Sequence, residues 1–268
     1  MYMLMLKWNI KQWLDAQNPR HALDDEDVPT PLVPTVSLSY TSTDSIDTVV
    51  VVPQSIKVVL DNVSKSAVGS IKVEYPQLTT DDNQNEEYDE DEQLYSAVSK
   101  EANLKTYQSA DIAVYRLEGQ RALAVVVPHF TNPIVEKVVA HELGKLPVDS
   151  ANWIILAPCV LNNGVSLSKL AAGSLFDNVP KVQPPHFITG IGAAVVSELA
   201  TLNRLEKCNT LILNAEGHPG YEKVDADSIM DAAEVASEYF VKSKADYIKK
   251  LSQSVRKINS SATSGMYI

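Results

Sequence analysis

The chain is poor in glycine, cysteine and long apolar runs, and each shortage argues against a class of protein. Glycine supplies 10 of 268 residues, about half of its usual share of roughly 7%, which argues against an enzyme built on glycine-rich phosphate loops. Two cysteines, Cys159 and Cys208, form neither a disulfide framework nor a four-ligand zinc site. No apolar run approaches the roughly 18 residues of a membrane span, and the apolar opening stops at Lys7 without signal-peptide flanks. We therefore expect a cytoplasmic protein, with the nucleus as a second location, and no membrane partner.

Basic residues are also in the minority. The chain has 23 lysines and arginines against 34 aspartates and glutamates, a net charge of −11. Proteins that bind phosphate backbones present a basic surface, so we expect no nucleic-acid partner. Between residues 81 and 92, eight of twelve residues are acidic, and such a block repels itself. It predicts a mobile acidic loop at about 79–93, either merely solvated or docking a basic partner.

What the sequence does contain is a set of apolar segments with the periods of strands and helices. The unbroken β-branched run at Val49–Val52 predicts a strand covered on both faces, and Pro158 is expected to end a second buried strand. The predicted strands are residues 48–52, 56–60, 71–75, 111–117, 121–128, 153–157 and 210–214, and the predicted helices are residues 131–145, 188–202, 226–240 and 244–258.

The order of these segments predicts the architecture. Strands and helices alternate in the second half of the chain, which implies parallel pairing with helices on both faces, whereas the first half is richer in hairpins. We predict an α/β fold, a single domain with a mixed, mostly parallel sheet flanked by helices, plus a flexible C-terminal tail. Residues 1–47 form an N-terminal extended and amphipathic segment, 48–258 the α/β domain, and 259–268 the tail.

Several familiar catalytic motifs begin in this sequence, but none is complete. His141 and Glu142 open the zinc motif H-E-x-x-H, yet Lys145 stands where the second histidine must be. Gly190 and Gly192 start a dinucleotide fingerprint whose third glycine is replaced by Val195. Neither a P-loop nor a G-x-S-x-G elbow occurs. We therefore expect no metal and no cofactor.

The enzyme alternative depends on a loop and on a few scattered side chains. Residues 214–222 (NAEGHPGYE) follow the end of a predicted strand, where open α/β sheets keep their ligand sites, and they include Glu216 and His218. This loop makes an α/β hydrolase- or phosphorylase-like enzyme the alternative, although a turn that uses the positive φ of glycine is the simpler interpretation of the loop. A serine nucleophile with His129, His186 or His218 as its base stays open. Cys159 is expected to be a structural thiol rather than a nucleophile.

The end of the sequence offers a binding motif. Met266, Tyr267 and Ile268 follow the linker-like residues 259–265. In the pattern hydrophobic-Tyr-any, the apolar side chain fills a groove, the ring buries area and donates a hydrogen bond, and the terminal carboxylate seeks a lysine. We expect these three residues to bind a partner.

Three stretches together resemble one known family. They are residues 183–190 (QPPHFITG), 216–223 (EGHPGYEK) and 264–268 (SGMYI), and residues 11–13, 19–21 and 23–24 resemble the family's N-terminus. On these residues the chain is similar to the proteasome assembly chaperone 1 family in its fungal form.

The resemblance implies a non-catalytic function. It implies a heterodimer with a second assembly chaperone that binds the α-subunit ring of the immature 20S core particle. It implies that the tail enters a pocket between neighbouring α subunits, with Met266 as the apolar anchor, Tyr267 as the packing ring and Ile268 as the source of the carboxylate. The other hypotheses are the enzyme and a proteasome activator that shares only the tail.

Overall fold

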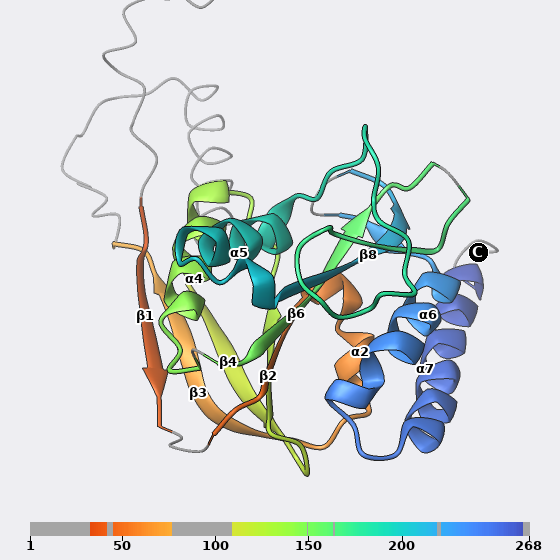
Figure 1. The fold of residues 1–268 in the computed structure, drawn as a ribbon, viewed down its shortest axis with the longest axis horizontal. Coiled ribbons are helices and arrows are strands. Elements are labelled where there is room, and N and C mark those ends of the chain that lie inside the picture. The colour runs from red at the N-terminus through yellow and green to blue at the C-terminus, as the bar shows by residue number, and fades with distance from the viewer. Residues whose placement is uncertain are drawn as a thin grey trace, which may run out of the picture. The chain divides into compact units, whose positions relative to one another are not determined.

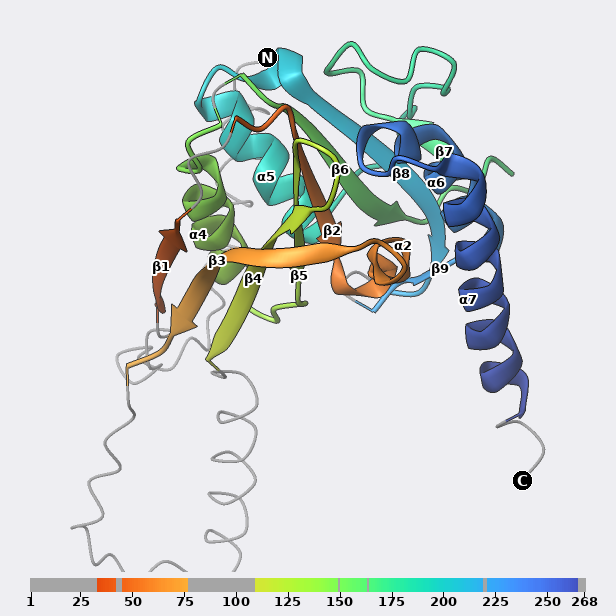
Figure 2. The same ribbon diagram turned by 90° about the horizontal axis from the view of Figure 1, so that it is seen from below.

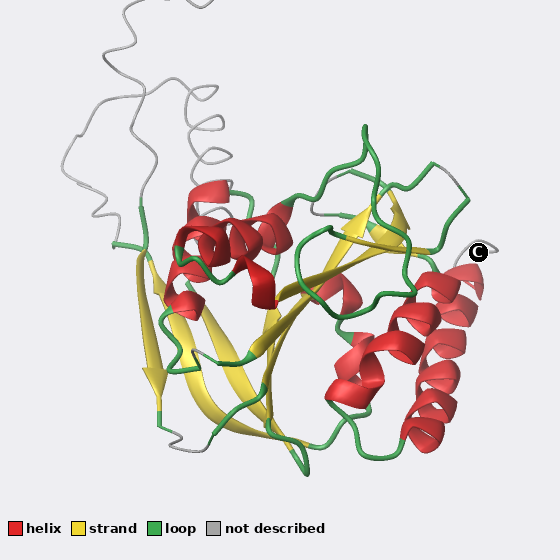
Figure 3. Ribbon diagram, viewed as in Figure 1, coloured by secondary structure: helices red, strands yellow, loops and turns green. Residues whose placement is uncertain are grey.

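The fold is known from a computed structural model that describes residues 33–41, 45–76, 109–148, 150–162, 164–218 and 221–264. The chain divides into the units Met1–Leu32 and Val33–Ile268, and every described residue belongs to the second. A nine-stranded sheet organises this unit, with strand order β1-β3-β4-β5-β2-β6-β8-β7 and β9 paired to β8. Helices cover both faces of the sheet, as Figure 1 and Figure 3 show.

The centre of the sheet is parallel. Its strands, in spatial order, are β5 (Ala122–Val127), β2 (Thr48–Pro53), β6 (Asn152–Cys159) and β8 (Cys208–Glu216). The predicted run Val49–Val52 is fully buried in β2. Its side chains alternate between the two faces and both faces are covered by helices, which explains why the run has no polar positions.

Antiparallel strands flank this centre on both sides. On one side, β4 (Ala110–Leu117) forms the predicted hairpin with β5, followed outward by β3 (Lys65–Glu74) and β1 (Thr35–Tyr40). On the other, β7 (Leu167–Lys169) and β9 (Lys223–Val224) pair with β8. The mixed sheet is therefore confirmed, although antiparallel pairings outnumber parallel ones among the described strands. Strand β1 lies within the predicted segment 1–47, so the sheet begins earlier than 48.

The two helical layers use different helices. Helices α4 (Pro133–Gly144) and α5 (Gly190–Thr201) pack on one face, with Val139, Leu143 and Val195 buried there. Helices α2 (Val58–Asp61), α6 (Ala226–Ala236) and α7 (Lys244–Ser264) cover the other, which Figure 2 shows from below. The short 3₁₀ helices are η2 (Gln54–Ile56), η3 (Leu205–Lys207) and η4 (Ser237–Tyr239).

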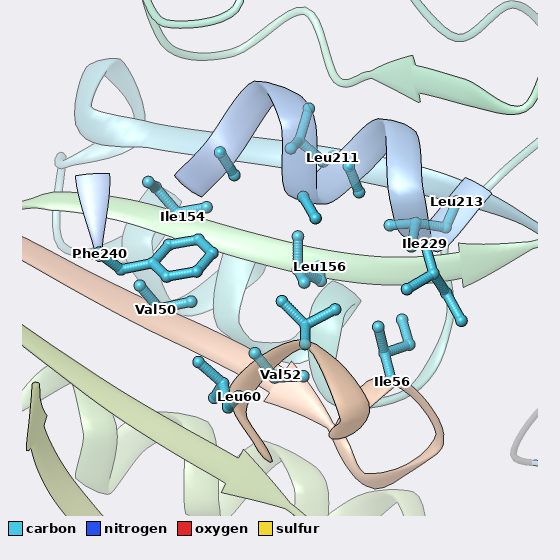
Figure 4. Packing of buried hydrophobic residues seen from close by; sticks show 14 of the residues in the cluster. Val50, Val52, Ile56, Leu60, Ile154, Leu156, Leu211, Leu213, Ile229 and Phe240 are labelled. Carbon is cyan, nitrogen blue, oxygen red and sulfur yellow. The ribbon is translucent and has the colours of Figure 1, made fainter. Parts of the chain in front are cut away.

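The core under α6 and α7 is drawn from strands and helices that are distant in sequence. Val50, Val52, Ile154 and Leu156 from neighbouring strands meet Ile229 and Phe240 there, and the other labelled residues in Figure 4 are Ile56, Leu60, Leu211 and Leu213. Complete burial of one such aliphatic side chain contributes about 1.5–3 kcal/mol. This apolar layer holds the parallel strands in place and so positions their carboxyl ends.

Three details differ from the sequence prediction. Residues 56–60 were expected as a strand but form the end of η2 and the helix α2, because a short apolar run suits a buried helical turn equally well. Strand β6 continues through Pro158 to Cys159. Helix α7 continues to Ser264, beyond the predicted end at 258, since serine, alanine and threonine are tolerated in helices. The acidic loop 79–93 and residues 265–268 lie outside the described residues.

Candidate functional site

The four parallel strands end side by side, and their carboxyl ends form one surface. Pro53 ends β2, Pro128 follows β5, and Pro158 is the last residue but one of β6. A pocket opens between these three residues and the start of α5. This is where open parallel sheets place their ligand sites. We call this surface the carboxyl edge and define it by Ser55, His129, Glu136, Cys159, Phe187, Thr189, Tyr221 and Glu222.

Two of the stretches that carry the family resemblance meet at this edge. His186 and Phe187 from the first stretch line a second pocket together with Gly217 and Glu222 from the other. The thiol of Cys159 donates a hydrogen bond to the carbonyl of Phe187, with Sγ and O 3.1 Å apart. Segments about thirty residues apart in the sequence therefore build one surface.

His186 fixes the loop that precedes α5. Its Nε2 accepts a hydrogen bond from the Asn162 amide at 3.3 Å, and its Nδ1 lies 2.9 Å from the carbonyl of Gln183. Since a backbone amide only donates and a carbonyl only accepts, these contacts require the tautomer with the proton on Nδ1. Both ring nitrogens are thus engaged in holding the loop, and His186 is not available as the base of a serine nucleophile.

The small residues at the start of α5 let this helix approach the sheet closely. A Cβ added to Gly192 would lie 3.0 Å from the Cβ of Ala157 in β6. Gly190 opens the helix with a φ of 64°, in the left-handed region that favours glycine. Gly192 therefore serves helix–strand packing, and Gly190 serves the turn into the helix, where Thr189 and Gly190 lie in the wall of the pocket.

Two carboxylates share the pocket. Glu136 lies in the first turn of α4, and Glu222 follows the turn after β8. Burial, and to a smaller extent the negative charge of Glu222, together raise the pKa of Glu136 from 4.5 to about 7. Carboxylates that repel one another in a partly buried site favour an occupant with positive charge.

Two aromatic side chains project from the carboxyl edge. Phe187 is 72% exposed and Tyr221 is 74% exposed, the highest values among the large apolar side chains that the structure describes. The rings of His129 and Tyr221 pack edge to face, with centroids 5.1 Å apart and an interplanar angle of 62°. Exposed aromatic rings beside a pocket are typical of interaction surfaces.

Hydrogen bonds hold the described residues of the loop 214–222 in place. Asn214 donates to a carboxylate oxygen of Asp225 at 2.6 Å and accepts from the Leu161 amide at 2.8 Å, so its side chain joins three segments. Glu216 pairs with Lys223 in the β8–β9 ladder. The His218 carbonyl accepts from the Tyr221 amide at 3.0 Å. The Asn214 side chain therefore has a role in the fold, and Glu216 and His218 contribute to these contacts through their backbone.

Cys159 is not activated as a nucleophile. Its thiol is half-buried, and burial raises its pKa, as does the charge of Glu222, against the opposing hydrogen bond to Phe187. A nucleophilic cysteine needs the opposite shift, because the thiolate is the reactive form. The prediction of a structural thiol is consistent with this environment.

His141 of the incomplete zinc motif belongs to an ion-pair network that joins helices α4 and α5. Glu198 of α5 is almost completely buried, and its two oxygens lie 3.0 Å from His141 Nδ1 and 3.0 Å from Lys137 Nζ of α4. Burial raises the pKa of Glu198, but the hydrogen bonds and charges of His141 and Lys137 outweigh it and lower the pKa overall. Across the residues that the structure covers, no cluster of histidine, cysteine and carboxylate side chains could hold a metal ion.

Sequence reasoning missed the individual residues of this edge. Phe187, Tyr221 and Glu222 were inside the quoted stretches, and their exposure depends on how the loops fold. Glu136 carries no signal of its own, because acidic residues are common in the first turn of a helix. The partner-binding residues Met266, Tyr267 and Ile268 lie outside the described part of the chain. Within that part, no helix combines the length and the apolar character of a membrane span.

A model of one protein family, described as the POC1 chaperone, matches residues 5–268 of this chain. The chain belongs to the POC1 chaperone family, proteasome assembly chaperone 1. The resemblance inferred from the three stretches is thereby confirmed, and with it membership in a family of proteasome-assembly chaperones.

The chain is also similar to several solved structures. The structure of Pyrococcus furiosus PbaA, an archaeal homolog of proteasome-assembly chaperone, is 11% identical, with a TM-score of 0.51 over 84% of this chain and 95% of that one. A monoclinic form of PbaA is 14% identical, with a TM-score of 0.48 over 86% and 94% of the two chains. A Corynebacterium glutamicum protein of unknown function is 11% identical, with a TM-score of 0.45 over 89% and 88%. No curated protein matches the chain.

Proposed function

We propose that this chain is a non-catalytic chaperone of 20S proteasome assembly that pairs with a second assembly chaperone and binds the α-subunit ring. The observation that carries the proposal is the family match, which extends over residues 5–268 and so includes the tail motif. The likeness of the fold to PbaA agrees with it. The Asn214 side chain and the Cys159 thiol make hydrogen bonds that hold neighbouring segments together, which favours the chaperone over the enzyme alternative.

In the proposed mechanism the tail enters a pocket between two α subunits. Met266 supplies the apolar anchor, and its unbranched side chain is flexible enough to adapt to the shape of the pocket. Tyr267 packs and donates a hydrogen bond, and Ile268 presents its carboxylate to a lysine of the pocket. Helix α7 runs to Ser264, and the four residues that follow reach at most about 13 Å at roughly 3.3 Å per residue. The end of α7 must therefore come close to the ring.

Deletion of residues 266–268 tests this proposal. The truncated chain and the intact chain, each paired with the second chaperone, are titrated against isolated α rings on native gels. We expect at least tenfold weaker ring binding after the deletion, with unchanged circular dichroism and unchanged pairing. Tyr267→Phe is the matched variant, since it keeps the ring and removes only the hydroxyl, and it should lose less than Tyr267→Ala. Equal binding by the truncated and intact chains would refute the tail mechanism.

The same preparation distinguishes a chaperone from a proteasome activator. An activator opens the gate of mature 20S particles and speeds hydrolysis of small peptides. The proposed chaperone instead associates with immature particles and leaves peptide hydrolysis by mature 20S at its basal rate. Faster peptide hydrolysis on addition of the chain would support the activator hypothesis instead.

A further inference from the structure

We infer that the carboxyl edge is a second docking surface for the α ring, and that it receives a ring segment with a lysine or arginine next to an apolar side chain. The basic side chain enters between Glu136 and Glu222, and the apolar one packs against Phe187. This inference rests on the proposed function and adds to it a contact that is independent of the tail.

Hydrogen bonds hold the backbone around Phe187, and the Tyr221 ring has an aromatic neighbour. The carbonyl of Phe187 accepts from Cys159, and the residue before it, His186, is bound through both ring nitrogens. The Tyr221 amide is bonded to the carbonyl of His218, and its ring meets His129. A rigid aromatic side chain loses little entropy when a partner covers it, which is the property of a binding hot spot.

The charge of the edge defines the occupant. Glu222 lines both the pocket that contains Glu136 and the pocket that contains Phe187. Among the described residues that line these two pockets, none is a lysine or an arginine. Glu136 thus has no lysine or arginine in the walls of its pocket, whereas Glu222 also shares a neighbouring pocket with Lys57 and Lys223. The net charge of −11 attracts a basic surface from a distance. An occupant with a cationic side chain supplies what the pocket walls lack.

Continuity with α7 indicates which partner covers the edge. Glu222 also lines a third pocket, which extends along Val224 and Ile229 to Val255 and Ile258 of α7. Ile258 is 52% exposed there, two turns before the helix ends at Ser264. The edge is therefore joined by a continuous surface to the helix that leads to the tail. A partner that binds the tail is in place to contact the edge as well, and two linked contacts raise affinity through effective concentration.

The test compares edge variants with the intact chain, each paired with the second chaperone and keeping the tail. Phe187→Ala combined with Tyr221→Ala removes both anchors, and Glu222→Lys reverses the charge. We expect each to weaken binding to isolated α rings at least tenfold, with unchanged pairing and thermal stability. Glu222→Gln should lose less than Glu222→Lys. The matched control is Leu205→Ala, an exposed apolar side chain before the amino end of β8, which should bind like the intact chain.

The outcomes separate this inference from the proposed function. Tail-dependent ring binding that is unaffected by the edge variants would overturn the edge contact and leave the proposed function standing. Loss of pairing with the second chaperone, with ring binding by the single chain unchanged, would assign the edge to the heterodimer and overturn the ring contact. Absence of ring binding by the intact pair would overturn both. Weaker binding by the edge variants at equal stability supports the inference.

Discussion

The two ends of the central parallel strands differ in how their charges are matched. At the amino ends, Arg121 before β5 lies 3.3 Å from a carboxylate oxygen of Asp47 before β2, and its Nε donates to the Ser45 carbonyl at 3.2 Å. At the carboxyl ends, Glu136 and Glu222 share a pocket without a lysine or arginine among its described lining residues. The amino ends therefore carry a matched ion pair, whereas the pocket at the carboxyl ends is lined by two carboxylates.

The two ends also differ in the segments that form them. A four-residue turn, 118–121, enters the amino end of β5. At the carboxyl ends, residues of the stretches 183–190 and 216–223 meet. Loops on a rigid sheet can expose aromatic and acidic side chains at little cost to the core, which is why function gathers on them. The following predictions test this contrast, from the largest expected effect on stability to the smallest.

Gly192→Val should have the largest effect on stability, because Gly192 lies where helix α5 packs against strand β6. The new side chain would collide with Ala157, whose Cβ lies 3.0 Å from the Cβ position of residue 192. We expect a loss of about 2 kcal/mol in the free energy of unfolding, measured by urea denaturation. Ala200→Val, exposed on the same helix, is the control and should change stability by less than about 0.5 kcal/mol. Equal losses in the two variants would contradict the close packing of α5.

Glu136→Gln should have a smaller effect that depends on pH. The pKa of Glu136 is raised to about 7 in the folded protein, above its ordinary value of 4.5, so the folded state binds this proton more tightly than the unfolded state. The stabilisation that comes from this tighter proton binding is present below pH 4.5 and is lost as the pH rises to about 7. The free energy of unfolding of the variant should therefore rise relative to that of the intact chain over this pH range, by about 1 kcal/mol after allowance for solvent screening.

Urea denaturation between pH 4 and pH 8 measures this difference. Glu206→Gln is the matched control, since Glu206 is exposed at the opposite end of the sheet. Its stability difference from the intact chain should stay constant over the same interval. A flat difference for Glu136→Gln as well would show that the pKa of Glu136 is not raised in the folded protein.

Arg121→Ala at the amino ends should have the smallest effect. The side chains of Arg121 and Asp47 are 56% and 61% exposed, and exposed pairs contribute about 0–1 kcal/mol. We expect a loss of less than about 0.5 kcal/mol, reduced further in 1 M salt, by the same denaturation measurement. A loss above about 1.5 kcal/mol would mean that the amino ends depend on this pair far more than its exposure implies.

The sequence predicted the buried elements of the fold better than its edges. The run Val49–Val52, the hairpin between β4 and β5 and the stripe of α4 are dominated by apolar periodicity, and the structure confirms them. Strands β1, β7 and β9 were missed because they are short or lie at the side of the sheet, where burial does not impose a clear pattern. Parallel and antiparallel neighbours are set by tertiary pairing and leave little local signal.

The candidate site was predictable only in part, for a similar reason. The stretches around Phe187 and Tyr221 were noticed through their family resemblance, yet their meeting at one surface depends on the folded sheet. The Glu136–Glu222 interaction joins the start of α4 to a residue after β8 that is distant in sequence. The local sequence around either residue does not indicate that the other lies nearby. Contacts between remote segments require the tertiary structure.

The most direct test of the central claim is affinity purification of the intact chain from cells, followed by mass spectrometry and sizing on native gels. The account predicts co-purification of a second assembly chaperone together with α subunits, in particles smaller than or equal to an immature 20S core. Deletion of residues 266–268 should remove the α subunits and keep the second chaperone. Recovery of neither the second chaperone nor any α subunit with the intact chain would contradict the account.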